Sequence, residues 1–139
     1  MDNPNMNILY FSKSDVAQSG PGMAEVIQIV EAAFREKVQG QVETPAKIGI
    51  HTRPDAFSHA MPAYLPEQKA AGIKWISAYP ENFKKNLPQI SGLIVLNDVE
   101  SGLPYAVMDC TWVTAARTGA ATALSAKYLA RSDSRVAGI

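Results

Sequence analysis

The feature that most constrains the fold is a change in hydrophobic periodicity close to Gly40. Before it, from Met23 to Val38, apolar residues recur at helical spacing, which predicts an amphipathic helix. After it, strand-like segments separated by turn residues follow one another, near residues 44–51, 57–65, 70–79, 89–97 and 103–110. Successive strands of this kind favour an antiparallel meander. The predicted class is therefore α+β, a mostly antiparallel sheet with flanking helices.

Two local signals refine this prediction. Residues 7–11 read as a short strand, and capping-type residues from Ser12 to Asp15 then indicate a brief helical turn. The clearest hairpin turns from Asp98 to Gly102, because Asp, Ser and Gly lie between the apolar runs 93–97 and 103–108.

A second long helix is predicted from Thr111 to Arg131, with Thr111 as the capping residue and Arg131 near the C-terminal end. Its small residues permit the close approach of a neighbouring backbone or of a ligand, and tight helix packing is the preferred explanation of them: Ala115, Ala116, Gly119, Ala120 and Ala123. The last segment, from Arg135 to Ile139, is expected to begin a buried strand.

Composition excludes several classes of protein. Hydrophobic residues make up 47% and charged residues 19% of 139 residues, values typical of one packed globular domain. Thirteen basic and thirteen acidic side chains cancel, so we expect no general attraction to nucleic acid or to an anionic membrane. The single cysteine, Cys110, excludes an intrachain disulfide and a cysteine-based metal cluster. With neither a leader nor a membrane-spanning run, the expected location is the cytoplasm.

Three cationic residues stand in segments otherwise suited to a folded core: Lys47, Lys74 and Arg117. On a strand Lys74 points away from Ile73 and Trp75, so it faces either a cleft or solvent. Arg117 interrupts a helix face of small residues, where its guanidinium could reach a carboxylate or phosphate in bidentate fashion. A solvated side chain remains the alternative for each of the three.

The remaining polar candidates carry weaker signals. For His51 and His59, a hydrogen-bonded strand histidine is preferred to a proton-transfer role, and no metal site is assigned because no carboxylate or thiol stands at ligand spacing from both. Cys110 is expected to be a packed thiol, and Asp98 and Glu100 are explained by the turn. No phosphate-binding glycine pattern occurs, so a nucleotide cannot be held by these residues alone.

Read together, several strings resemble the ornithine cyclodeaminase and mu-crystallin family in order and spacing, from about Ile8 to Ile139. They are His59-Ala-Met-Pro-Ala-Tyr64, Gly72-Ile-Lys-Trp-Ile-Ser77, Tyr79-Pro-Glu-Asn82, Gly92-Leu-Ile-Val-Leu-Asn-Asp98 and Thr114-Ala-Ala-Arg-Thr-Gly119. The resemblance implies a substrate-binding and dimerisation domain over residues 1–131, and that residues 132–139 begin a Rossmann domain for NAD or NADP. It also implies that the catalytic aspartate lies beyond Ile139, so that this stretch alone is inactive. Homodimerisation through the N-terminal sheet is implied as well.

By this resemblance Lys47 and Lys74 bind an amino acid's carboxylate, Arg117 lies where that carboxylate meets the nicotinamide, and Gln89 lies near the cofactor. Many family members carry arginine at the position of Lys47. Because a lysine is a point charge rather than a fork, carboxylate recognition is expected to be less rigid here and substrate choice to differ.

The implied reaction begins with hydride transfer from the amino acid's Cα to NAD⁺, giving an imine. In an ornithine cyclodeaminase the side-chain amine then closes a ring, ammonia leaves and proline results, whereas relatives reduce cyclic ketimines or oxidise alanine. Two alternatives stay open. One is a noncatalytic ligand-binding or dimerisation protein of the mu-crystallin type, and the other makes Lys74 a Schiff-base lysine, which requires a buried amine of depressed pKa.

Overall fold

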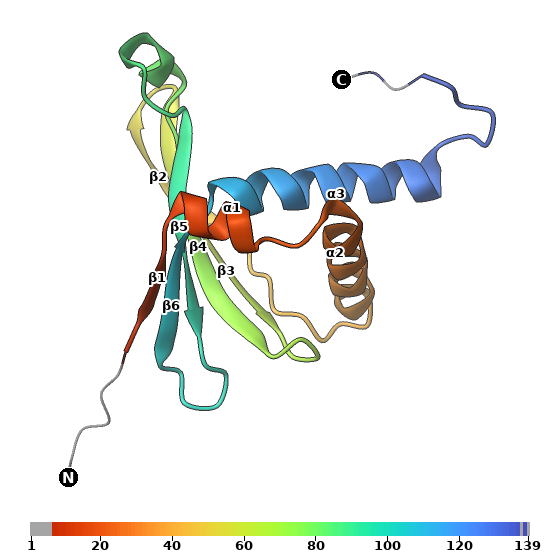
Figure 1. The fold of residues 1–139 in the computed structure, drawn as a ribbon, viewed down its shortest axis with the longest axis horizontal. Coiled ribbons are helices and arrows are strands. Elements are labelled where there is room, and N and C mark those ends of the chain that lie inside the picture. The colour runs from red at the N-terminus through yellow and green to blue at the C-terminus, as the bar shows by residue number, and fades with distance from the viewer. Residues whose placement is uncertain (1–6, 137, 139) are drawn as a thin grey trace.

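The computed structural model describes residues 7–136 and 138 and contains a six-stranded sheet and three α-helices (Figure 1). The strands are β1 (Leu9–Phe11), β2 (Ile48–Arg53), β3 (Ala56–Leu65), β4 (Ala70–Ala78), β5 (Ile90–Asn97) and β6 (Pro104–Asp109). The helices are α1 (Lys13–Ser19), α2 (Met23–Val38) and α3 (Thr111–Leu129), with a short 3-10 helix, η1 (Pro80–Lys85), between β4 and β5. The α+β class is confirmed.

The sheet has the order β1-β6-β5-β4-β3-β2, so strands β2 to β6 form the predicted antiparallel meander. Strand β1 adds to its edge by pairing in parallel with β6, Tyr10 opposite Val107. The hairpin between β5 and β6 is also confirmed. Asp98 donates its backbone N–H to Leu103 at 2.9 Å, its carboxylate accepts the Ser101 N–H at 2.8 Å, and Gly102 takes the left-handed conformation with φ of 73°.

The two faces of the sheet differ. Helices α2 and α3 lie on one side of it (Figure 1). On the other face, the register aligns Ile48, Ala60, Trp75 and Leu93 side by side across four strands. The side chains of Ile48, Trp75 and Leu93 remain 71%, 43% and 42% exposed. We call this row and the surface around it the open face.

The core between the helices explains part of the alanine content of α3. Ala116 and Ala120 are buried against Val26 of α2, because their small side chains let the two helices approach closely. The packing prediction is wrong for Ala115 and Gly119, which are exposed. They lie on a different side of the helix from the buried pair, and the 3.6-residue period allows only one stripe to face α2.

The predicted helix ends are partly corrected. Ser12 caps α1 as expected, in a capping box with Asp15. Thr111 does not cap α3 but is its first residue, and the Asp109 carboxylate accepts the Thr111 N–H at 2.8 Å. Strand β6 runs almost directly into the helix, whose N-cap residue, Cys110, makes no side-chain capping hydrogen bond. The helix ends at Leu129, short of the predicted Arg131.

The predicted strand from Arg135 to Ile139 does not form over Arg135 and Val136. A strand needs a neighbour to supply its hydrogen bonds, and among the described strands none pairs with these two residues. Ala137 and Ile139 lie outside the described residues.

A buried carboxylate ties α2 to the turn between β3 and β4. Glu36, only 2% exposed, accepts the backbone N–H of Glu67 at 2.8 Å and the side-chain amide of Gln68 at 3.2 Å. Helix α2 otherwise makes most of its contacts with α3. Glu36 therefore sets the distance between the end of α2 and the sheet.

Replacing Glu36 by alanine is expected to lower the free energy of unfolding by about 2 kcal/mol, because two hydrogen bonds to a charged acceptor are lost. Urea unfolding followed by tryptophan fluorescence measures the change. Glu36→Gln is the matched control, since its amide oxygen still accepts the Glu67 N–H and should limit the loss. Equal losses in the two variants would show that packing, and not the hydrogen bonds, holds this turn.

Candidate functional site

The principal cleft lies between the helix-covered face of the sheet and the helices themselves. It has a volume of about 580 Å³ and is lined by side chains of α2, α3, β3, β4 and β5. Most of the lining is apolar, as at Val30, Met61, Ile94 and Leu96. Cationic groups enter it at Lys37, Lys74 and Arg117.

Lys74 is placed in this cleft by strand alternation. Its cross-strand partners are Met61 and Ile94, which line the same cleft, while Trp75 belongs to the open face. The lysine is half-buried. Of the two placements considered from the sequence, the cleft is correct and free solvent is wrong.

The electrostatics of Lys74 favour an anionic ligand. Burial lowers the pKa of its ammonium from the ordinary 10.5, and the positive charge of Arg117 lowers that pKa further, while Cys110 acts weakly in the opposite direction. Among the described residues, neither Lys74 nor Arg117 forms a salt bridge with a carboxylate. A bound carboxylate would relieve both the repulsion and the burial cost.

Arg117 reaches the cleft from α3. It lies one turn after Val113 and one turn before Ala121, and all three line the cleft along one edge of the helix. The arginine itself is exposed, so its guanidinium lies at the mouth of the cleft rather than in its depth. Lys74 and Arg117 thus line the same cleft, as the resemblance implied.

Lys47 is placed differently. It precedes β2, is exposed and does not line the cleft. Extending the β2–β3 register by one residue places it beside Met61, whose other neighbour is Lys74. With strands about 4.8 Å apart, Lys47 and Lys74 are roughly 10 Å apart in their backbones. Lys47 therefore lies at the rim of the same sheet face. It could reach a ligand bound in the cleft, but it does not line the cleft as Lys74 and Arg117 do.

The two histidines form an aromatic cluster beyond this rim. His59 stacks on Phe57 with ring centroids 4.1 Å apart, and His51 meets the same phenyl ring edge-on at 6.5 Å. Burial, then the charges of Lys47 and His51, lower the pKa of His59. Neither imidazole makes a hydrogen bond within the described residues, so the expectation of hydrogen-bonded strand histidines is wrong. Both rings pack against Phe57 instead.

Gln89 and Cys110 have local packing roles in the structure. Gln89 donates its side-chain amide to the Pro80 carbonyl at 2.8 Å, and it does not line the cleft. Its predicted place near a cofactor remains a prediction. Cys110 is fully buried as a packed thiol, as expected, just before α3 and against Gly92.

The apolar contribution of α2 to the cleft was missed from the sequence. Ile29, Val30, Ala33 and Phe34 line it. The sequence did contain a signal for this. The apolar stripe on α2 is wider than the surface that α3 covers, because Ile29 and Phe34 remain exposed.

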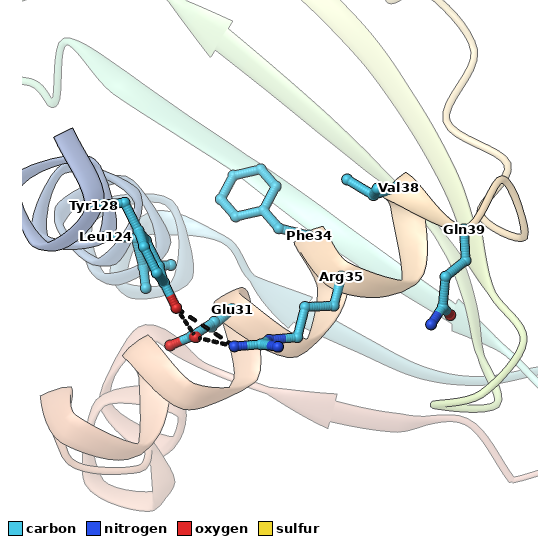
Figure 2. A pocket seen from close by; sticks show the side chains of 7 residues that line it. All are labelled: Glu31, Phe34, Arg35, Val38, Gln39, Leu124 and Tyr128. Atoms are coloured by element: carbon cyan, nitrogen blue, oxygen red, sulfur yellow. Dashed lines mark hydrogen bonds and ion pairs between the residues drawn. The ribbon is translucent and has the colours of Figure 1, made fainter.

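A second hollow, of about 540 Å³, lies between α2 and the end of α3 (Figure 2). Glu31 is its polar centre. Its carboxylate accepts hydrogen bonds from Lys127 at 2.8 Å, from the Tyr128 hydroxyl and from Arg35 at 2.8 Å, which together lower its pKa to about 2. The Glu31 carboxylate is thus paired with side chains of both α2 and α3.

Two further features are absent from the described part of the chain. No group of three or more histidine, cysteine, aspartate or glutamate side chains there could hold a metal ion. No helix there is both long and apolar enough to cross a membrane.

Comparisons with known proteins find relatives over most of this chain. The pattern of the ornithine cyclodeaminase/mu-crystallin family matches residues 11–139. The nodulation efficiency protein NfeD of Rhizobium meliloti is 47% identical over 128 residues, covering 92% of this chain and 40% of that protein. The alanine dehydrogenase of Archaeoglobus fulgidus is 41% identical over 133 residues, covering 96% of this chain and 40% of that protein.

Among solved structures, the Delta(1)-pyrroline-2-carboxylate reductase of Thermococcus litoralis, in complex with NADH and L-proline, superposes with a TM-score of 0.87 at 43% identity, covering 92% of this chain and 40% of that one. An archaeal alanine dehydrogenase dimer with bound NAD gives a TM-score of 0.84 at 40% identity, covering 91% and 38%. This chain thus spans about 40% of the length of such relatives. The match over most of its residues, at these identities, shows that the chain belongs to the ornithine cyclodeaminase/mu-crystallin family.

Proposed function

We propose that this chain is the substrate-binding half of an NAD(P)-dependent amino-acid enzyme. The observation that carries the proposal is the Lys74–Arg117 pair, two cations that line a mostly apolar cleft and form no salt bridge with a carboxylate of the described residues. An amino acid's carboxylate fits such a pair through charge-assisted hydrogen bonds, with Lys47 as a third cation at the rim. The cytoplasmic location expected from the sequence is part of this proposal.

The residues of this chain would act by orientation. With its carboxylate held by Lys74 and Arg117, the substrate has one end fixed near the exposed Arg117, and the reaction requires that its Cα–H then face the mouth of the cleft. A nicotinamide cofactor bound there would supply the hydride acceptor. Residues 1–131 form the substrate domain in this proposal, and residues 132–139 begin a domain that holds the cofactor's pyrophosphate and the catalytic aspartate.

Three relatives are named as enzymes that act on an amino acid or its cyclic imine: alanine dehydrogenase, Delta(1)-pyrroline-2-carboxylate reductase and ornithine cyclodeaminase. The common chemistry is hydride transfer between the substrate's Cα and the nicotinamide, and it is the reaction that we propose. Ornithine cyclisation to proline with loss of ammonia remains one candidate outcome of it. Residues 1–139 alone are expected to be inactive.

We also propose that the protein is a homodimer through the open face. Ile48, Trp75 and Leu93 are large, apolar and exposed in one row, and an isologous pairing of two sheets would remove them from water. The archaeal alanine dehydrogenase that resembles this chain is described as a dimer.

The direct test is an assay of the protein carrying both halves with NAD⁺ and a panel of L-amino acids, following NADH by absorbance and ammonia chemically. Formation of NADH, ammonia or both with at least one amino acid is the expected result. The absence of both products with every amino acid, together with retained binding of carboxylate ligands, would favour the noncatalytic binding protein, since the cleft can hold an anion without chemistry.

A further inference from the structure

His59 lies on the helix-covered face of the sheet, close to the position of Lys74. Its cross-strand partners are Gly49 on β2 and Ile76 on β4. Two residues farther along β3, Met61 is the partner of Lys74. Because alternate side chains of a strand project from the same face, His59 and Met61 lie side by side, about 7 Å apart along the strand. His59 is therefore a neighbour of the cationic site, although it does not line the cleft itself.

The imidazole of His59 is turned toward the edge strand β2. A Cβ atom at Gly49 would collide with this imidazole, so the ring occupies the space above β2 that a side chain would otherwise fill. Lys47 precedes Gly49 by two residues, and continuation of the strand places both on the same face. The ring therefore lies on the side of the site where Lys47 forms the rim.

An aromatic stack fixes the ring in this position. Phe57 lies face to face with His59, with ring centroids 4.1 Å apart and an interplanar angle of 22°. The histidine is half-buried, so part of its ring is accessible from the rim. In its charged form an imidazole donates from both nitrogens, which suits it to bind an anion.

The charges that act on His59 are positive. On β2 these are Lys47 and His51, whereas β4 places the apolar Ile76 beside the ring and Lys74 one residue pair farther along. None of the salt bridges among the described residues includes His59. Burial, followed by the charges of Lys47 and His51, lowers the pKa of His59 from its ordinary 6.5. In the free site the imidazole is therefore neutral at neutral pH and gains its proton in mildly acidic solution.

We propose that protonated His59 takes part in binding the substrate's carboxylate, as a positive charge that is added to the rim only in acid. This inference rests on the proposed function, because it takes Lys74 and Arg117 as the carboxylate anchor. It goes further by giving His59 a part in the same site and by making the affinity of that site depend on pH.

The direction of the pH effect follows from linkage. A bound carboxylate favours the imidazolium, so it raises the pKa of His59, and protonation raises the affinity for the carboxylate by the same factor. The affinity is low and constant above the pKa of the liganded site, rises as the pH falls, and becomes constant again below the pKa of the free site.

Pentanoate is the probe, because it carries a carboxylate and no amine, and it is largely ionised above about pH 5.5. Isothermal titration calorimetry of the protein carrying both halves measures its dissociation constant at about pH 5.5 and about pH 7.5, on either side of the histidine range. We expect the affinity to be roughly threefold higher at the acidic pH, a gain typical of one added charge pair at a partly exposed site.

His59→Gln removes the titrating group and should lose this gain, while its affinity at the higher pH stays close to that of the wild type. Any contribution of Lys74 to the pH dependence persists in the variant, so the difference between the two proteins isolates His59. His51→Gln is the matched control, because His51 contacts the same phenyl ring but lies one residue pair farther from Lys74 along the face. It should retain the gain.

A full gain in a folded His59→Gln protein would overturn the inference and leave the proposed function intact, since the carboxylate still binds. The absence of pentanoate binding at both pH values would contradict the carboxylate anchor, and with it the proposed function. If His59→Gln does not fold, a proton NMR titration of the wild-type imidazoles decides the question, with His51→Gln to assign the signals. Pentanoate should move the titration of His59 to higher pH, and an unmoved titration would overturn the inference.

Discussion

Replacing Lys74 by methionine is expected to cause the largest loss of activity in the protein carrying both halves. Methionine keeps most of the length and apolar contact of the lysine but removes its charge. Truncating one partner of a buried, hydrogen-bonded charge pair costs about 2–5 kcal/mol, which corresponds to roughly 30- to 5,000-fold in kcat/KM. Steady-state kinetics with the preferred amino acid measure the loss.

The pH dependence of this effect has a defined sign. Carboxylate binding favours the ammonium form of Lys74, so substrate affinity is complete below the pKa of the free site and falls as pH rises through it. Because burial and Arg117 lower that pKa, KM should begin to rise at a pH below 10.5. Lys74→Arg should flatten this alkaline limb, since its guanidinium stays protonated throughout.

The same arginine variant separates two roles of Lys74. Partial activity in Lys74→Arg supports carboxylate binding, whereas a Schiff-base role would leave the variant as inactive as Lys74→Met. Lys85→Met, an exposed lysine at the end of η1, is the matched control and should leave kcat/KM unchanged. Unchanged kinetics in Lys74→Met would remove Lys74 from the site and with it the anchor of the proposed function.

Replacing Trp75 by aspartate is expected to convert the proposed dimer into monomers. A buried tryptophan at the centre of an interface contributes about 2–4 kcal/mol, and a two-fold symmetric dimer contains the substitution twice. The dissociation constant should therefore rise by roughly three orders of magnitude or more. Sedimentation velocity over a range of protein concentrations measures it.

The control for this substitution is Leu129→Asp, which changes an 82% exposed leucine at the end of α3, away from the open face. It should leave the dimer intact. A Trp75→Asp protein that is folded and still dimeric at the same concentrations would place the dimer interface elsewhere.

Much of the fold was predictable because the signals are local. The bounds of α2 agree with the prediction at both ends, since its apolar stripe starts after Gly22 and stops before Gly40. The meander follows from its successive strand segments, and the β5–β6 hairpin follows from its short turn. The parallel pairing of β1 with β6 had no such signal, because about a hundred residues separate the partners and nothing local encodes parallel neighbours.

The site was predictable only in part. Strand alternation places Lys74 and Trp75 on opposite faces, but it does not say which face the helices cover. That choice depends on how α2 and α3 pack, which is a tertiary property. The resemblance named Lys47, Lys74 and Arg117 together, whereas the register separates Lys47 from Lys74 by one strand and leaves it at the rim.

The junction between β6 and α3 has a mechanical consequence. Only Cys110, which is fully buried, separates the strand from the helix, and the Asp109 carboxylate fastens the first turn. Helix α3 is therefore a rod of about 28 Å clamped at its strand end. If the proposed cofactor domain follows this helix, a change in that domain's orientation occurs after Leu129 and leaves Arg117, which lies within the helix, in place.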